Sequence, residues 1–137
     1  MTTILDDIVH RCDAIEECYE FMLGYAAQGL SDDRVSRSGS QLRELLSRAV
    51  QAALGLSGAY STLVRELRME PAERYEAFLA VIERDTANAL AAIQLVLAQP
   101  KISSQLIDNL NASIHLRTLL TDIFLIDEVV KLPQSSS

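Results

Sequence analysis

Asp85 is the residue whose position in the sequence most clearly suggests chemistry. It occurs in the segment "ERDTANAL", at the centre of an otherwise apolar helical stripe that also holds Ile82 and Ala89. A buried carboxylate must be paired, protonated or bound to a metal ion. An antiparallel helical hairpin that closes near Lys101 places Arg117 about level with Asp85. We therefore expect these two charged side chains to meet inside the protein.

Two interpretations of this pair remain open. In the first, Asp85 and Arg117 form an internal ion pair that fixes the register of the helices without adding net stability. In the second, both line a polar pocket in the middle of the protein, with Cys12 and Tyr60 as neighbours. Such a pocket would be a small-molecule site, or a site of proton chemistry on a small molecule.

The remaining polar residues give no catalytic or cofactor motif. Di-iron bundles need Glu-x-x-His pairs, and the sequence contains none. The two histidines, His10 and His115, are expected at the surface. There is no Cys-x-x-Cys zinc spacing and no glycine-rich phosphate loop after a strand. We therefore expect no metal, no cofactor and no catalytic residue, and we interpret the chain as a non-enzymatic protein.

Four helical patterns account for most of the chain. They run from about residue 3 to 28, 41 to 68, 71 to 98, and 103 to 131. Thr3 with Asp6, and Ser38 with Gln41, have capping-box spacing, and Ser103 or Ser104 can cap the last helix. Long helices joined by short loops bury their stripes by packing antiparallel. The sequence predicts an all-α, up-down-up-down antiparallel four-helix bundle, with one domain over residues 1–132 and a disordered C-terminal tail over residues 133–137.

The last predicted helix carries more apolar surface than one core requires. Its main stripe serves the bundle, and a second, narrower stripe is left over. A leftover apolar stripe on a soluble protein usually marks an interface. The residues of this possible interface are Ile107, Ile114, Leu125 and Val129.

Two glycines within the second predicted helix, Gly55 and Gly58, fall on its outward side. Each glycine costs roughly 1 kcal/mol relative to alanine inside a helix, so its presence needs a reason. One interpretation is a local kink or break at "GLSG". The other is the close approach of a partner helix at a place where no side chain stands in the way.

The charge and the cysteines restrict the class of partner and the compartment. The net charge is −7 at pH 7, which repels nucleic acids and anionic membrane surfaces. No apolar run approaches the roughly 20 residues that a membrane-spanning helix needs. Cys12 and Cys18 lie six residues apart and cannot easily pair on one helix. Two buried free thiols suggest a reducing cytoplasm.

These observations favour a cytoplasmic helical adaptor or accessory protein that acts through protein–protein interaction, as a homodimer and with a possible further protein partner. A homodimer is expected because closed cyclic dimers are the commonest assembly. The alternative is a small-molecule-binding bundle with its site around Asp85 and Arg117.

Overall fold

The computed structural model describes residues 3–135, with side chains described for residues 3–130. Within these residues the chain is helical and has no strand, so the predicted all-α class is confirmed. The elements are α1 (Ile4–Ala27), the short 3-10 helix η1 (Asp33–Val35), α2 (Arg37–Ala53), α3 (Leu56–Glu66), α4 (Ala72–Leu97), α5 (Ser104–Ala112) and α6 (His115–Ser135).

Two of the four predicted helical segments are each divided in the middle, the second at "GLSG", where a break was one of the two interpretations, and the fourth at a place where no break was predicted. The second predicted helix is divided into α2 and α3, and the fourth is divided into α5 and α6. The expected tail of residues 133–137 falls partly within α6, which extends to Ser135, and residues 136–137 lie outside the described residues.

Helix starts follow the polar side chains that cap them. Thr3 forms the predicted capping box with Asp6 at the start of α1. Ser103 caps α5 by accepting a hydrogen bond from the backbone N–H of Leu106. Ser38 does not cap α2: the helix begins at Arg37, and Ser36 is the residue whose side chain accepts from the N–H of Gly39.

The break between α2 and α3 is centred on Gly55. Its φ of +83° is left-handed, a conformation that glycine adopts without steric cost. The guanidinium of Arg11 on α1 lies beside it and donates to the backbone carbonyls of Ala52 and Leu54 at 3.0 and 2.6 Å. These carbonyls have lost their helical partners at the end of α2. Of the two interpretations of "GLSG", the local break is the one that the structure contains.

The break between α5 and α6 falls at Ser113 and Ile114. The φ of Ile114 is +60°, which is unusual for a β-branched side chain. The hydroxyl of Ser113 donates to the carbonyl oxygen of Leu110 at 2.5 Å and so binds one of the carbonyls exposed at the end of α5. This break changes the rotation of α6 relative to α5, so the two helices do not present one continuous stripe.

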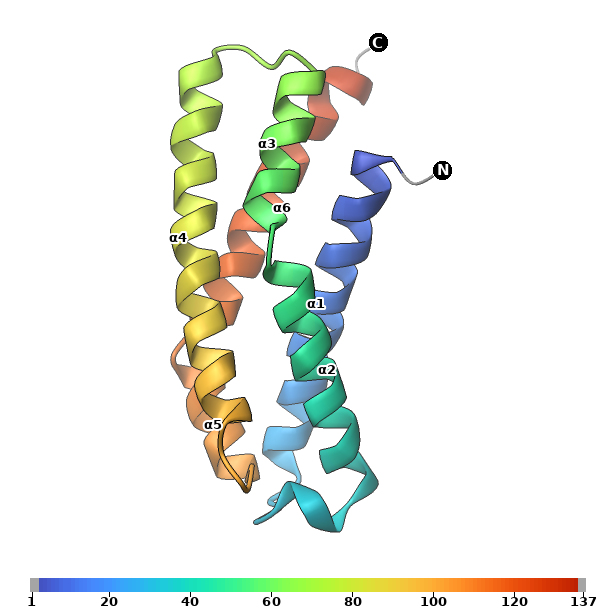
Figure 1. Ribbon diagram of the computed structural model, residues 1–137, viewed down its shortest axis with the longest axis vertical. Helices are drawn as coiled ribbons and strands as arrows, with labels where there is room; N and C mark the ends of the chain where they lie inside the picture. The colour runs from blue at the N-terminus through green and yellow to red at the C-terminus, as the bar shows by residue number, and fades with distance from the viewer. Residues whose placement is uncertain (1–2, 136–137) are drawn as a thin grey trace.

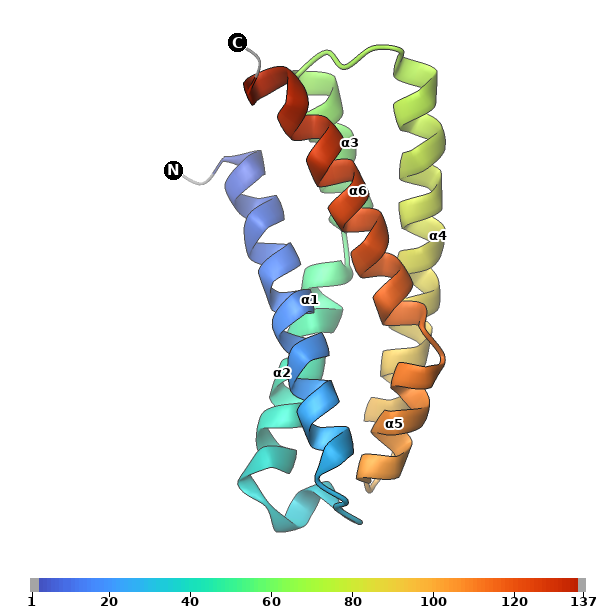
Figure 2. The same cartoon turned by 180° about the vertical axis from the view of Figure 1, so that it is seen from behind.

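The helices alternate in direction along the long axis of the molecule (Figure 1). α1 runs one way, α2 and α3 return in succession, α4 runs with α1, and α5 and α6 return again. α1 packs on α2, and α4 packs on both α3 and α6. Seen from behind, α6 lies between α1 and α4 (Figure 2). One side of α6 is therefore directed toward α1 and the opposite side toward α4.

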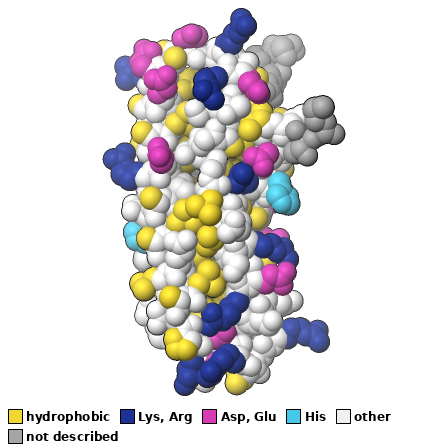
Figure 3. Space-filling model, viewed as in Figure 1, with side chains coloured by type: hydrophobic (Ala, Val, Ile, Leu, Met, Phe, Trp, Pro, Cys, Tyr) yellow, Lys and Arg dark blue, Asp and Glu magenta, His cyan; other side chains and the backbone are white. Residues whose placement is uncertain are grey.

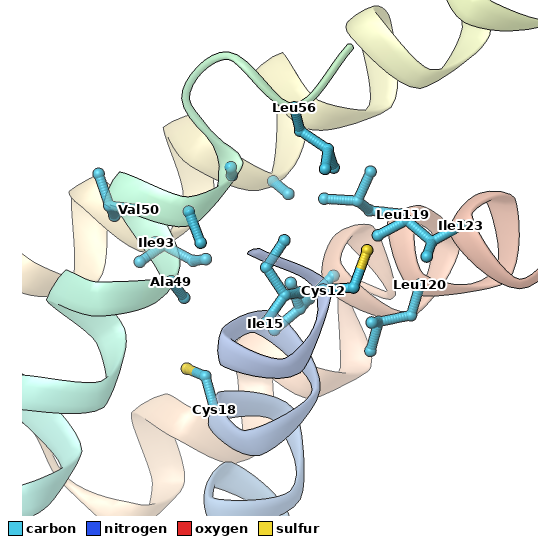
Figure 4. Close-up of a cluster of buried hydrophobic side chains, with 14 of the residues drawn as sticks. Cys12, Ile15, Cys18, Ala49, Val50, Leu56, Ile93, Leu119, Leu120 and Ile123 are labelled. Atoms are coloured by element: carbon cyan, nitrogen blue, oxygen red, sulfur yellow. The ribbon is translucent and has the colours of Figure 1, made fainter. Parts of the chain in front are cut away.

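The core is aliphatic and runs the length of the molecule. Side chains from α1, α2, α4 and α6 meet in it, including Ile15, Ala49, Ile93 and Ile123 (Figure 4). Cys12 and Cys18 are both buried and both free. On the face seen in Figure 3, hydrophobic side chains form a narrow streak near the middle, and many of the charged side chains gather toward the two ends.

Candidate functional site

Three helices meet at a buried hydroxyl group. Tyr60 of α3 is fully buried, and its hydroxyl donates to Oδ1 of Asp127 on α6 at 2.6 Å. The thiol of Cys12 on α1 lies 3.4 Å from the same hydroxyl oxygen. The structure therefore brings together Cys12 and Tyr60, two of the four residues expected in one polar centre. Asp127 was not predicted as a member of the site. It lies on the same helical stripe as Ile123 and Val130, and a carboxylate among apolar residues on such a stripe is a signal that could have identified it.

Neither the thiol nor the phenol of this cluster is activated. Burial raises the pKa of the Cys12 thiol to about 11, so almost no thiolate is present at neutral pH. Burial, followed by the neighbouring Cys12 and the hydrogen bond to Asp127, raises the pKa of Tyr60 well above its usual value. The nucleophilic form of cysteine is the thiolate. The cluster is thus suited to holding three helices together and unsuited to nucleophilic catalysis.

A second polar contact joins α4 to α6. The carboxyl group of Asp122 is hydrogen-bonded to that of Asp85, and both side chains are half-buried. Burial, the hydrogen bond and the negative charge of Asp85 raise the pKa of Asp122 to about 7. Two ionised carboxylates can only accept, so this bond requires a proton held between them. Oδ2 of Asp122 is buried, and no donor among the described residues forms a hydrogen bond with it.

The expected Asp85–Arg117 ion pair does not form. Arg117 is exposed, and the ion pairs formed within the described residues do not include it. The prediction assumed one continuous helix after Lys101. The break at Ile114 changes the register and rotation of α6, and Asp122 comes to face Asp85 instead. The four residues expected in one polar centre thus divide into the Cys12–Tyr60 contact, the Asp85–Asp122 contact, and an exposed arginine.

Among the described residues, an ion pair with a buried carboxylate lies elsewhere, at the end of the molecule where α1 ends and α2 begins (Figure 1). Asp33 of η1 is buried, and its carboxylate accepts from Nε of Arg43 at 2.5 Å and from the N–H of Ile102 at 2.6 Å. The same guanidinium donates to the carbonyls of Leu97 and Gln99 at the end of α4. These bonds tie η1 and α2 to the loop after α4. These contacts were not predicted, because residues 31–40, "SDDRVSRSGS", have no helical stripe.

Two open grooves flank α6 on its outer side. The first, which we call the α4–α6 groove, has a volume of about 320 Å³ and a wall that is almost wholly apolar. The second, which we call the α1–α6 groove, has a volume of about 430 Å³. The α4–α6 groove is lined by Pro71, Arg74, Tyr75, Phe78, Leu125, Ile126 and Val129. The α1–α6 groove is lined by Glu16, Tyr19, Glu20, Leu23, Arg117, Leu120, Thr121 and Phe124.

The four non-glycine residues of the expected interface do not lie on one surface. Leu125 is 55% exposed and Val129 is half-buried, and both line the α4–α6 groove. Ile114 is exposed at the break, away from this groove. Ile107 cannot belong to an outer surface, because it lies on the buried side of α5 and is fully buried in the core. Leu125 and its neighbour Phe124, which is 52% exposed, each open toward a different groove.

The glycines of the expected interface are both exposed, and neither lines one of the two grooves. A Cβ added to Gly58 would meet no described atom within 4 Å, whereas at Gly55 it would lie 3.8 Å from the Arg11 guanidinium. Gly58 thus leaves open space on the outside of α3.

Within the described residues, no group of three or more histidine, cysteine, aspartate and glutamate side chains is arranged to hold a metal ion. No helix among the described residues has the length and apolar character needed to cross a membrane.

Comparisons with known proteins give no relative for this chain: no protein-family model, no curated protein and no solved structure matches it.

Proposed function

We propose that this protein is a non-enzymatic helical adaptor that acts through protein–protein interaction and pairs with a second copy of itself. The observation that carries the proposal is the α4–α6 groove. Leu125 and Val129 form one wall of it and Tyr75 and Phe78 the other, so a contiguous apolar surface lies open to water. Exposed apolar patches of this kind usually mark interaction sites.

A second copy is the occupant that suits this groove. Arg74 is the only charged residue that lines it among the described residues, so two such surfaces can meet without opposing blocks of like charge. A twofold axis would pair the surface with itself, and the exposed Leu125 of each copy would fill the groove of the other. The dimer would then bury Leu125 and Val129, the two residues of the predicted leftover stripe that line this groove.

We further propose that the fold is an up-down-up-down bundle of four members, two of which are interrupted. The alternation of direction in Figures 1 and 2 supports this description. A reducing cytoplasm is the proposed compartment, because Cys12 and Cys18 are free.

A second candidate function is supported by the Asp85–Asp122 pair. Asp122 also lines a small surface hollow of about 190 Å³ together with Ile114 and Arg117. A carboxyl group whose pKa is about 7 can take up or release a proton at neutral pH. A small-molecule site here requires that Asp85→Asn weakens ligand binding more than it changes folding, whereas a structural pair would show the reverse.

The test of the dimer is light scattering after size exclusion, on the wild type and on the Leu125→Glu/Val129→Glu variant. The proposal expects a dimeric wild type and a folded monomeric variant, with the fold checked by circular dichroism. The matched control is Leu5→Glu/Val9→Glu, which places two exposed glutamates at the same spacing on α1 and should remain dimeric. A monomeric wild type, or a variant that still pairs, would overturn the homodimer.

A further inference from the structure

The α1–α6 groove lies on the other flank of α6 from the α4–α6 groove and differs from it in chemistry. Its apolar part includes Leu23 and Phe124, which are 49% and 52% exposed, and the buried Leu120. The lining residues of each helix span about two helical turns, roughly 10 Å. A short amphipathic helix with apolar side chains on successive turns has the length and shape to lie between α1 and α6.

The α1 side of this groove is acidic. Glu16 and Glu20 stand along it, one helical turn apart, and the ion pairs formed within the described residues include neither. Burial and then the charges of Asp13, Glu20 and Asp127 raise the pKa of Glu16. Negative charge is therefore concentrated on the α1 side of the groove, where Glu16 and Glu20 lie, and a cation placed beside it would be attracted. Arg117, on the α6 side, is the only basic residue that lines the groove in the described chain.

The groove combines an apolar surface with an acidic rim, which is formed by Glu16 and Glu20. We therefore propose that the α1–α6 groove binds a basic amphipathic helix of a partner protein. The apolar face of that helix covers Leu23 and Phe124, and its lysine or arginine side chains pair with Glu16 and Glu20. The inference rests on the proposed adaptor function and names the chemistry of its partner. The electrostatic complementarity would raise the association rate and select against acidic partners.

A second copy of this chain is a poorer occupant of the groove. Each copy carries a net charge of −7, so a second copy brings no excess of positive charge to the acidic rim. The partner is therefore a different protein. A dimer formed through the α4–α6 groove would leave the α1 side of α6 free to bind it.

The experiment measures binding of a fluorescent model helix to the full chain by fluorescence anisotropy. The probe is an amphipathic peptide of leucine and lysine at helical spacing, and its control peptide has glutamate in place of every lysine. The proposal expects the lysine peptide to bind, with an affinity that falls as salt rises, and the glutamate peptide not to bind.

Protein variants then locate the site. Glu16→Gln/Glu20→Gln should weaken binding of the lysine peptide about tenfold, and Phe124→Ala should weaken it by a similar factor. The control, Glu76→Gln/Glu83→Gln, makes the same change of charge at two exposed positions on α4, outside both grooves, and should bind as the wild type does. Circular dichroism of each variant establishes that it is folded.

Three results would overturn the inference: equal weakening by the control variant, equal binding of the two peptides, or loss of self-association in Glu16→Gln/Glu20→Gln. The last would assign the groove to a second copy. The homodimer is tested separately by the Leu125→Glu/Val129→Glu variant. A monomeric wild type that still binds the lysine peptide through Glu16 and Glu20 would contradict the homodimer and leave this inference standing.

Discussion

The hydroxyl of Tyr60 on α3 donates a 2.6 Å hydrogen bond to the carboxylate of Asp127 on α6, in a part of the core that also receives Cys12 from α1. The three helices are far apart in the sequence, and apolar packing alone would allow them to slide along one another. A directional bond to a half-buried carboxylate is formed in only one register. We interpret this contact as a device that fixes the relative positions of α1, α3 and α6.

Tyr60→Phe should therefore destabilise the protein although it removes a single oxygen atom. The carboxylate of Asp127 loses a donor in a half-buried position, and leaving such a group under-satisfied costs about 1–3 kcal/mol. The free energy of unfolding, measured with urea, should fall by this amount.

The matched control for this substitution is Tyr75→Phe. Tyr75 is half-buried at the wall of the α4–α6 groove, and its hydroxyl forms no hydrogen bond with the described residues. Its removal should change the free energy of unfolding by less than about 0.5 kcal/mol. Equal effects of the two substitutions would show that the Tyr60–Asp127 bond adds nothing to stability.

The Asp85–Asp122 contact makes stability depend on pH in a direction opposite to that of an ordinary ion pair. The folded-state pKa of Asp122 is about 7, above the usual 3.8, so the folded protein binds more protons than the unfolded chain between these values. Stability therefore falls as pH rises from about 4 to about 7. Asp122→Asn removes the titrating group. As pH rises from 5 to 8, the melting temperature of this variant should fall less than that of the wild type.

The control for this pH experiment is Asp108→Asn, an exposed aspartate on α5. It makes the same change in net charge and should keep the pH dependence of the wild type. If Asp122→Asn and the wild type lost stability in parallel over this pH range, the shared proton between Asp85 and Asp122 would be disproved.

The partner of Asp85, which is Asp122 and had been predicted to be Arg117, shows which features of this fold can be predicted from sequence and which cannot. The helical class and the capping box at Thr3 follow from local patterns and were predicted. The pairing of Asp85 depends on register, which depends in turn on the backbone at Ile114. Its φ of +60° has no signal in the sequence, since isoleucine rarely adopts this conformation. Because the backbone at Ile114 was not predicted, the expected orientation of the following helix was wrong. The prediction therefore placed Arg117, in place of Asp122, beside Asp85.

The grooves were partly accessible to sequence reasoning. The surplus of apolar residues in the last predicted helix correctly pointed to Leu125 and Val129 as partly open to water. Ile107 was wrongly included, because the stripe was drawn through the α5–α6 break. The opposing walls at Tyr75 and Glu16 come from other helices, and their contacts with α6 require the three-dimensional structure.

Substitution of Gly39 and of Gly58 by alanine should change the free energy of unfolding in opposite directions. A Cβ on Gly39 would clash with the backbone oxygen of Asp33, a residue that is held in place by its ion pair with Arg43. Gly39→Ala should therefore destabilise the protein by about 3 kcal/mol or more. At Gly58, in open space on α3, alanine should raise the free energy of unfolding by up to about 1 kcal/mol.

Urea unfolding of the two glycine variants, side by side, measures both effects under the same conditions. Gly58→Ala is also informative about partners. If it is stabilising and leaves self-association unchanged, then the close-approach interpretation of Gly58 is disproved for the homodimer.

Arg11 should be important for the α2–α3 break because it supplies the donors that the broken helix lacks. Its guanidinium donates to the carbonyls of Ala52 and Leu54, and its Nε pairs with Asp7 at 2.9 Å. A cation at a helix C-terminus also interacts favourably with the helix dipole. Arg11→Met retains most of the aliphatic stem and removes the donors, and the free energy of unfolding should fall by about 1 kcal/mol.

The same substitution should increase local opening of the backbone at the α2–α3 break. This local effect would distinguish capping by Arg11 from a general loss of stability. The amide of Leu54 donates to the carbonyl of Val50, and that of Ala59 to the carbonyl of Gly55. Their hydrogen exchange should accelerate more in Arg11→Met than that of amides in the middle of α4. Arg48→Met is the control, since Arg48 forms only an exposed ion pair with Glu44. Uniform acceleration across the chain, or no difference from Arg48→Met, would show that Arg11 does not hold the break in place.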